Sequence, residues 1–229
     1  MSSSDTLIPP ARRGRPKSRP EVERRTQAAR SEDMQRRILD AAAKVMSSHG
    51  YAGFRTAEVS RVAGISRGAQ LHHFPTKDQL IVATLAHVYD QALAVSRQRA
   101  AAVDPARDIL DLLIEDAREF FFSRHFLVAV DIVLSTATEP SVREQVLDIA
   151  RGARLPVEQA WGQALAAAGI PADLAPGLLS IMLGVVRGLA LRKLWDNDPK
   201  RDDQQFAMLR DMARAYIAAQ GKSRGPKRG

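Results

Sequence analysis

From Ser31 onward, nearly every segment of the chain repeats apolar residues at the spacing of an α-helix. The first segment places Met34, Ile38, Ala42 and Val45 on one helical face. Alternating β-branched runs bounded by turn residues, which indicate strands, do not occur in the sequence. We therefore predict an all-α fold of about nine helices, divided into a three-helix head and a larger helical domain.

Small polar residues and glycines mark the expected helix ends in the head. Ser31, Thr56 and Ser66 are expected N-caps, and Gly50 and Gly64 are expected stops. The expected helices are 32–49, a short helix that follows the Thr56 cap and ends at Ala63, 67–73 and 77–100, followed by 104–122, 124–138, 141–169 with a bend at Pro156, 172–196 and 201–220.

The positive charge of the chain gathers at its two ends. The formal net charge is +8; residues 1–30 contain eight Arg or Lys against three Asp or Glu, and residues 221–229 contain four against none. Residues 76–220 have an excess of acid. This asymmetry favours contact with a polyanion at one end, although solubilising tails are the alternative. The expected domains are a disordered basic arm at 1–30, a head at 31–76, a helical domain at 77–220 and a basic tail at 221–229.

Composition excludes several classes of protein. The chain has no cysteine, so thiol catalysis, thiolate metal sites and disulfides are excluded. The start of the chain lacks an apolar segment of signal-peptide length. The longest apolar stretch, 174–186, ends at Arg187, short of the roughly 20 residues of a membrane span. We expect a soluble, cytoplasmic protein without a membrane partner.

The stretch GISRGAQLHHFP, residues 64–75, favours DNA recognition. Two short helices joined by a glycine turn after a first helix form a helix-turn-helix, here at about 55–74, whose second helix enters the major groove. Gly68 and Ala69 are small enough for close approach to DNA. Ser66 and the free N–H groups of the helix start can bind phosphate, and Arg67 has the planar fork that reads guanine.

The paired histidines of this stretch raise the alternatives of a metal site or a catalytic base. Adjacent helical residues point about 100° apart, so His72 and His73 are poorly placed to share a metal. Their short helix contains no Asp, Glu or Cys, and no serine–histidine–acid pattern surrounds Ser66. We predict no metal site and no catalytic residue, and hence not an enzyme.

The block ILDAAAKVMSSHGYAGFRTAEVSRVAGISRGAQLHHFPTKDQL resembles the TetR family of bacterial transcriptional regulators. The resemblance implies a homodimer with one DNA-binding head per subunit and a divergent C-terminal domain that binds a small effector and dimerises. It also implies phosphate contacts from Arg55, Thr56, Ser66, His73 and Lys77, and base-edge contacts from Arg67 and Gly68.

The middle of the recognition helix departs from the family pattern, which usually has an apolar residue followed by an aromatic one. This chain has Gln70 and Leu71 there. Leu71 can touch a thymine methyl group, and Gln70 can read adenine if it points outward. The sequence leaves the direction of Gln70 open, and both residues belong to the expected DNA-binding set with Ala69.

An arm upstream of the head contains Arg12-Arg13-Gly14-Arg15-Pro16-Lys17, which resembles the AT-hook core. Such a segment lies along a narrow A·T minor groove, with Arg13 and Arg15 following its negative potential. A solvated basic tail is the alternative.

The helical domain offers candidates for an effector site and a dimer interface. The expected pocket residues are Phe120, Phe122, His125, Phe126 and Trp161, with Glu115 and Asp131 as further polar anchors; ordinary core packing is the alternative. The expected dimer residues are the small side chains Gly177, Ser180, Gly184 and Gly188, together with Leu209 and Met212; packing within one subunit is the alternative.

These observations favour a dimeric, ligand-responsive repressor that binds a palindromic operator in double-stranded DNA. Its only expected ligand is an unidentified small-molecule effector, and we expect it to associate with the bacterial nucleoid. The alternatives are an architectural A·T-binding nucleoid protein and, less favoured, an all-helical enzyme.

Overall fold

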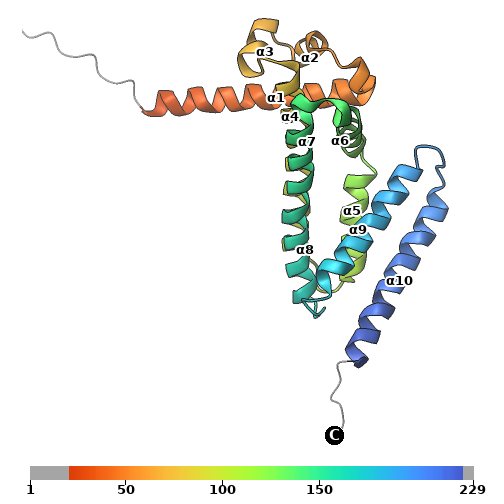
Figure 1. Cartoon of the computed structure of the whole chain (residues 1–229). Helices are drawn as coiled ribbons and strands as arrows, with labels where there is room; N and C mark the ends of the chain where they lie inside the picture. The colour runs from red at the N-terminus through yellow and green to blue at the C-terminus, as the bar shows by residue number, and fades with distance from the viewer. Residues whose placement is uncertain (1–20, 224–229) are drawn as a thin grey trace, which may run out of the picture. The chain divides into compact units, whose positions relative to one another are not determined.

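The computed structural model describes residues 21–223, and all regular secondary structure in this range is helical (Figure 1). The chain divides into two compact units, Met1–Arg36 and Arg37–Gly229. The helices are α1 Glu21–Gly53, α2 Thr56–Ala63, α3 Arg67–His73, α4 Lys77–Ala101, α5 Ile109–Phe121, α6 Arg124–Ser135, the short 3₁₀ helix Thr136–Thr138, α7 Pro140–Gly152, α8 Arg154–Ala167, α9 Ala175–Arg192 and α10 Pro199–Ser223. The predicted all-α class is confirmed.

The first helix begins earlier than the sequence analysis predicted. Helix α1 starts at Glu21, so Ser31 lies inside the helix and is not its N-cap, and the last part of the predicted disordered arm is helical. Residues 21–30 contain no Gly or Pro and are rich in Glu, Arg, Ala and Gln, which are good helix formers. Gly50, the predicted stop, has left-handed φ and interrupts the helical geometry.

Two turns define the head. Gly64 ends α2 with φ 65° and ψ 39°, a left-handed conformation that favours glycine. Thr56 does not cap α2 as predicted: Arg55 is the extended N-cap residue, and its carbonyl accepts the N–H groups of Glu58 and Val59. Thr76 caps α4 and forms a capping box with Gln79.

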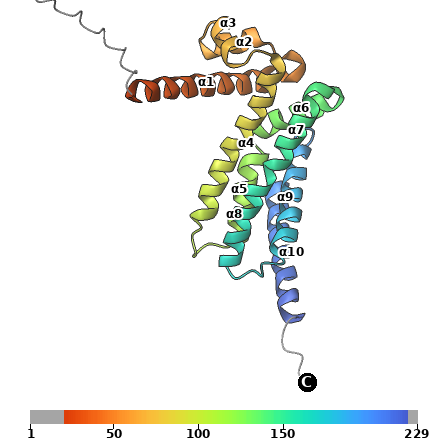
Figure 2. The ribbon, with the colours of Figure 1, turned by 60° about the vertical axis from the view of Figure 1, so that its left-hand side comes forward.

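The helical domain is built around α4, which leads out of the head and packs against α6, α7 and α8 (Figure 2). A buried core holds α5, α8, α9 and α10 together, and its largest members include Leu113, Trp161, Leu165 and Met182. By length and composition α9 could cross a membrane, but its apolar residues supply a large part of this core.

The predicted helix over 141–169 is two helices. The break lies at Ala153, between α7 and α8, and not at Pro156. Pro156 lies in the first turn of α8, where a backbone N–H has no intrahelical acceptor, so proline costs no helical hydrogen bond there.

Candidate functional site

The start of α3 presents small and cationic residues on an open surface. Ser66 caps the helix, and its hydroxyl accepts the N–H of Ala69 at 3.1 Å. Arg67 and Gly68 are exposed, and Ala69 is half-buried. A Cβ added to Gly68 would meet only the Ser66 hydroxyl, at 3.9 Å. Packing within the described residues therefore does not require glycine here.

Gln70 points into the head and not outward. It is 1% exposed, and its side-chain oxygen accepts the Ser60 hydroxyl at 2.7 Å. The expectation that Gln70 belongs to the DNA-reading set is therefore wrong, because its amide links α3 to α2. Leu71 is 41% exposed and points outward. The half-buried residue of the histidine pair is His73, and His72 is the exposed one.

Three further predicted DNA contacts flank α3. Lys77 is exposed at the start of α4, and its ammonium lies 5.4 Å from the centroid of the Tyr51 ring. Arg55 is exposed, and its guanidinium donates to the carbonyl of Ala52 at 2.9 Å. Thr56 is half-buried. The residues of the AT-hook-like segment, Arg13 and Arg15, lie outside the described part of the chain.

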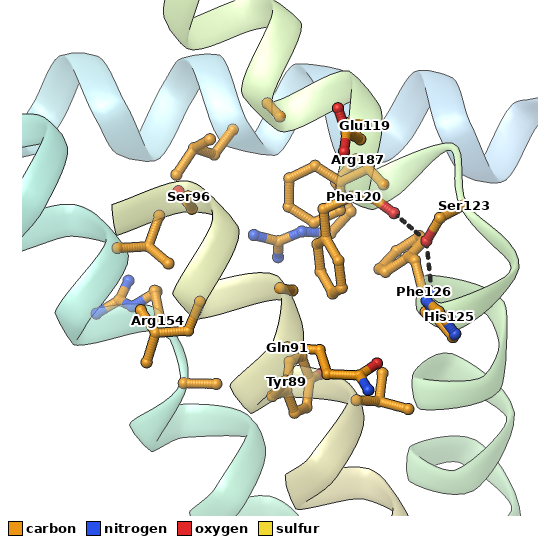
Figure 3. Close-up of a pocket in the computed structure, with 18 of the residues that line it drawn as sticks. Tyr89, Gln91, Ser96, Glu119, Phe120, Ser123, His125, Phe126, Arg154 and Arg187 are labelled. Carbon is orange, nitrogen blue, oxygen red and sulfur yellow. Dashed lines mark hydrogen bonds between the residues drawn. The ribbon is translucent and has the colours of Figure 1, made fainter. Parts of the chain in front are cut away.

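A cavity of about 860 Å³ lies in the helical domain, between α4, α5, α6, α7, α8 and α9 (Figure 3). The predicted residues Phe120, His125 and Phe126 line it, with mostly apolar neighbours. The rings of Phe120 and Phe126 meet edge to face, with centroids 5.7 Å apart. The size and apolar character suit a small organic ligand.

Two predicted pocket residues belong to the core instead. Trp161 is 1% exposed, and its indole N–H donates to Asp116 at 2.9 Å and to Ser96 at 3.1 Å. Phe122 faces Phe206, with ring centroids 5.8 Å apart. Neither lines the cavity. Large aromatic side chains fill cores and pockets alike, so residue type does not separate these roles.

Most polar residues of the cavity wall were not predicted from the sequence. Tyr89, on α4, and Arg187, on α9, both line the cavity (Figure 3). The signal for Arg187 was a single cation interrupting the apolar sequence of α9. Of the other predicted anchors, Glu115 is exposed and pairs with Arg107. Within the residues described, no cluster of His, Cys, Asp or Glu could hold a metal ion.

Tyr51 connects the head to the wall of the cavity. Its backbone N–H donates to Asp131 on α6 at 2.6 Å, and its hydroxyl donates to Glu139 at 2.8 Å. Burial and the bond to Glu139 raise the pKa of Tyr51 well above its usual value, so the hydroxyl stays protonated. Phe126 and Val130, on the same helix as Asp131, line the cavity. Helix α6 thus contacts the head, through Tyr51, and also forms part of the cavity wall.

Helices α9 and α10 both have exposed apolar side chains. The predicted stripe on α9 is exposed, as are several large apolar side chains beside it. Leu209 is 7% exposed and belongs to the subunit core, so the expectation that it lies in a dimer interface is wrong. The exposed apolar side chains of the two helices are Ile181, Val185, Met208, Met212 and Tyr216.

The helix-turn-helix head, with its open recognition helix, and the helical domain with its cavity define a DNA-binding transcriptional regulator. Residues 38–84 match the family model described as bacterial regulatory proteins, tetR family. The HTH-type transcriptional regulator CymR of Pseudomonas putida is 38% identical over 195 residues, which cover 85% of this chain and 96% of that relative. The chain belongs to the TetR family.

Solved structures agree with this fold. A putative TetR-family transcriptional regulator from Mesorhizobium loti superposes with a TM-score of 0.61 at 20% identity, covering 83% of this chain and 96% of that one. The multidrug binding protein EbrR, complexed with ethidium, superposes with a TM-score of 0.57 at 23% identity, covering 80% of this chain and 96% of the EbrR chain.

Proposed function

We propose that the protein is a ligand-responsive repressor that binds a palindromic operator as a homodimer. The observation that carries the DNA-binding part is the open start of α3, where exposed Arg67 and Gly68 stand next to the capped N-terminus. In the major groove, Arg67 reads guanine through its guanidinium, and Gly68 and Ala69 let the backbone approach. Leu71 contacts a thymine methyl group.

Phosphate contacts surround this reading helix. Ser66 and the N–H groups of the α3 start bind one phosphate, and Lys77 binds another from the start of α4. Arg55, Thr56 and His73 complete the set implied by the family resemblance, and exposed His72 is a further candidate. Each lost phosphate contact weakens binding to all sequences alike and lowers its salt dependence.

The exposed apolar face of α9 and α10 supports dimerisation. Gly184 and Gly188 allow a partner helix to come close, and Ile181 and Met212, 66% and 64% exposed, lose contact with water when covered. Pairing these two helices with their equivalents forms a four-helix bundle. The two heads of the dimer then read major grooves about 34–36 Å apart.

The cavity supports regulation by a small-molecule effector. A ligand that contacts α6 favours one conformation of this helix, which also holds Tyr51 through Asp131. If that conformation has a head spacing that does not match DNA, ligand binding weakens operator binding by the difference in its affinity for the two conformations. No metal, cofactor or catalytic step takes part in this mechanism.

The two charged ends extend the DNA contact. We place Arg13 and Arg15 in an A·T minor groove beside the operator and leave the tail at 221–229 as a basic segment. Deleting residues 1–20 then weakens binding mainly at A·T-flanked sites, whereas an equal loss at G·C-flanked sites reflects charge alone. The protein acts in the cytoplasm, on the nucleoid.

Genomic selection of bound DNA, followed by footprinting, tests the proposal. The expected result is a small set of symmetric sites whose neighbouring genes suggest the effector. Widespread A·T-rich binding without symmetric sites would instead support an architectural nucleoid protein.

A further inference from the structure

Arg187 differs from the other charged side chains of the cavity wall in having no ion-pair partner in the part of the chain described. Arg99 pairs with Glu119 and lies 3.5 Å from Asp116. Arg154 pairs with Glu158 at 3.4 Å. The guanidinium of Arg187 instead lies over the ring of Phe121, 5.3 Å from its centroid.

The carboxylates of the wall are committed to other partners. Asp116 is 7% exposed and accepts the Ser96 hydroxyl at 2.5 Å and the Trp161 indole N–H at 2.9 Å. Glu119 is held by Arg99. A cationic ligand would have to break these interactions, whereas an anionic ligand finds Arg187 free to pair.

Tyr89 adds a neutral donor on the same wall. Burial raises its pKa, and the nearby positive charge of Arg187 partly opposes this effect. The hydroxyl therefore stays protonated at neutral pH. It has no hydrogen-bond partner among the described side chains and can donate to an anion.

We propose that the effector is a small apolar monoanion, such as an aromatic carboxylate or sulfonate, whose acidic group binds the Arg187 guanidinium while its apolar body contacts Phe120 and Phe126. This inference rests on the proposed function of the cavity as an effector site. The planar guanidinium offers two parallel N–H donors to such a group. Phe121 holds it in place by a cation–π contact.

Three fluorescent dyes of different charge test the proposal on the full-length protein. The anion is 8-anilino-1-naphthalenesulfonate, its neutral counterpart is N-phenyl-1-naphthylamine, and the cation is ethidium. We expect Arg187→Met to lower the affinity for the anionic dye about tenfold, which is the effect of losing one charge-assisted contact. The affinity for the neutral dye should not change. Arg187→Lys should retain part of the affinity, and Arg97→Met, a nearby exposed cation outside the wall, should retain all of it.

Ala92→Trp, which fills the cavity from α4, separates two kinds of failure. Circular dichroism confirms that each variant is folded. The charge preference is wrong if Ala92→Trp abolishes dye binding but Arg187→Met leaves binding of the anionic dye unchanged. It is also wrong if ethidium binds more tightly than the anionic dye. In both cases the cavity remains an effector site. Dye binding that Ala92→Trp leaves unchanged, or no dye binding at all, contradicts the proposed function of the cavity itself.

Discussion

The side-chain oxygen of Gln70 accepts the hydroxyl of Ser60 at 2.7 Å, and this buried bond joins the recognition helix α3 to α2. Gln70→Ala should therefore lower the free energy of unfolding by about 1 kcal/mol, which urea denaturation would measure. Base preference in the variant that remains folded should be unchanged. Leu71→Ala is the matched change on the outer face, and it should alter base preference with little loss of stability.

The bond between Tyr51 and Glu139 predicts a role in coupling the cavity to the head. Tyr51→Phe removes the hydroxyl bond and keeps the backbone bond to Asp131. We expect a loss of about 1 kcal/mol in stability and a smaller ligand-induced change in operator affinity. Arg151→Gln, which breaks the exposed Arg151–Asp148 pair on α7, is the control. An unchanged ratio of operator affinities with and without ligand would exclude Tyr51 from the coupling.

The exposed face of α9 predicts how dimerisation can be broken. Ile181→Glu places a charge in the proposed interface, where pairing would remove it from water. Sedimentation at micromolar concentration should show monomers for this variant and dimers for Leu155→Glu, which changes an equally apolar, 54% exposed residue on α8. Dimers in both variants would place the interface elsewhere.

Acid should loosen the attachment of α10 to α5. Burial raises the pKa of Asp108, but Arg214 and the N–H groups of Leu110 and Asp111 outweigh this effect and bring it below its usual value. A lowered pKa in the folded state gives stability that is present above about pH 4 and is lost as the pH falls through the folded pKa. Asp108→Asn should therefore have a lower melting temperature at pH 7 and a weaker dependence on acid below pH 4. If the melting temperatures of the wild type and of Asp108→Asn fall in parallel as the pH is lowered, Asp108 does not have this role.

The sequence predicted the turn between α2 and α3 well because single residues determine it. Gly64 adopts the left-handed turn that the pattern requires, and Ser66 caps α3 as expected. The start of α1 was wrong because a good capping residue, Ser31, lies within a longer run of helix formers. The break near Pro156 was misplaced because proline fits the first turn of a helix as well as a bend.

Side-chain direction could not be predicted from the sequence. Successive residues of a helix point about 100° apart, so either Gln70 or Leu71 could face outward in the short helix α3, and the choice between them required tertiary structure. The same limit applies to Trp161 and Leu209, because a buried apolar residue can face a core, a cavity or a partner subunit. Arg187 was visible as a charge within the apolar sequence of α9, but its freedom from ion pairs depends on the positions of Glu119 and Asp116.

In the proposed docking, α3 reads DNA through Arg67 while Lys77 contacts the phosphate backbone. Affinity for a set of operators, each with one base pair changed, tests it directly with Arg67→Ala and Lys77→Ala. Arg67→Ala should remove discrimination worth about 1–3 kcal/mol at one position in each half-site, whereas Lys77→Ala should weaken all operators equally and reduce the salt slope by about one. An unchanged discrimination profile for Arg67→Ala would contradict the proposed docking of α3.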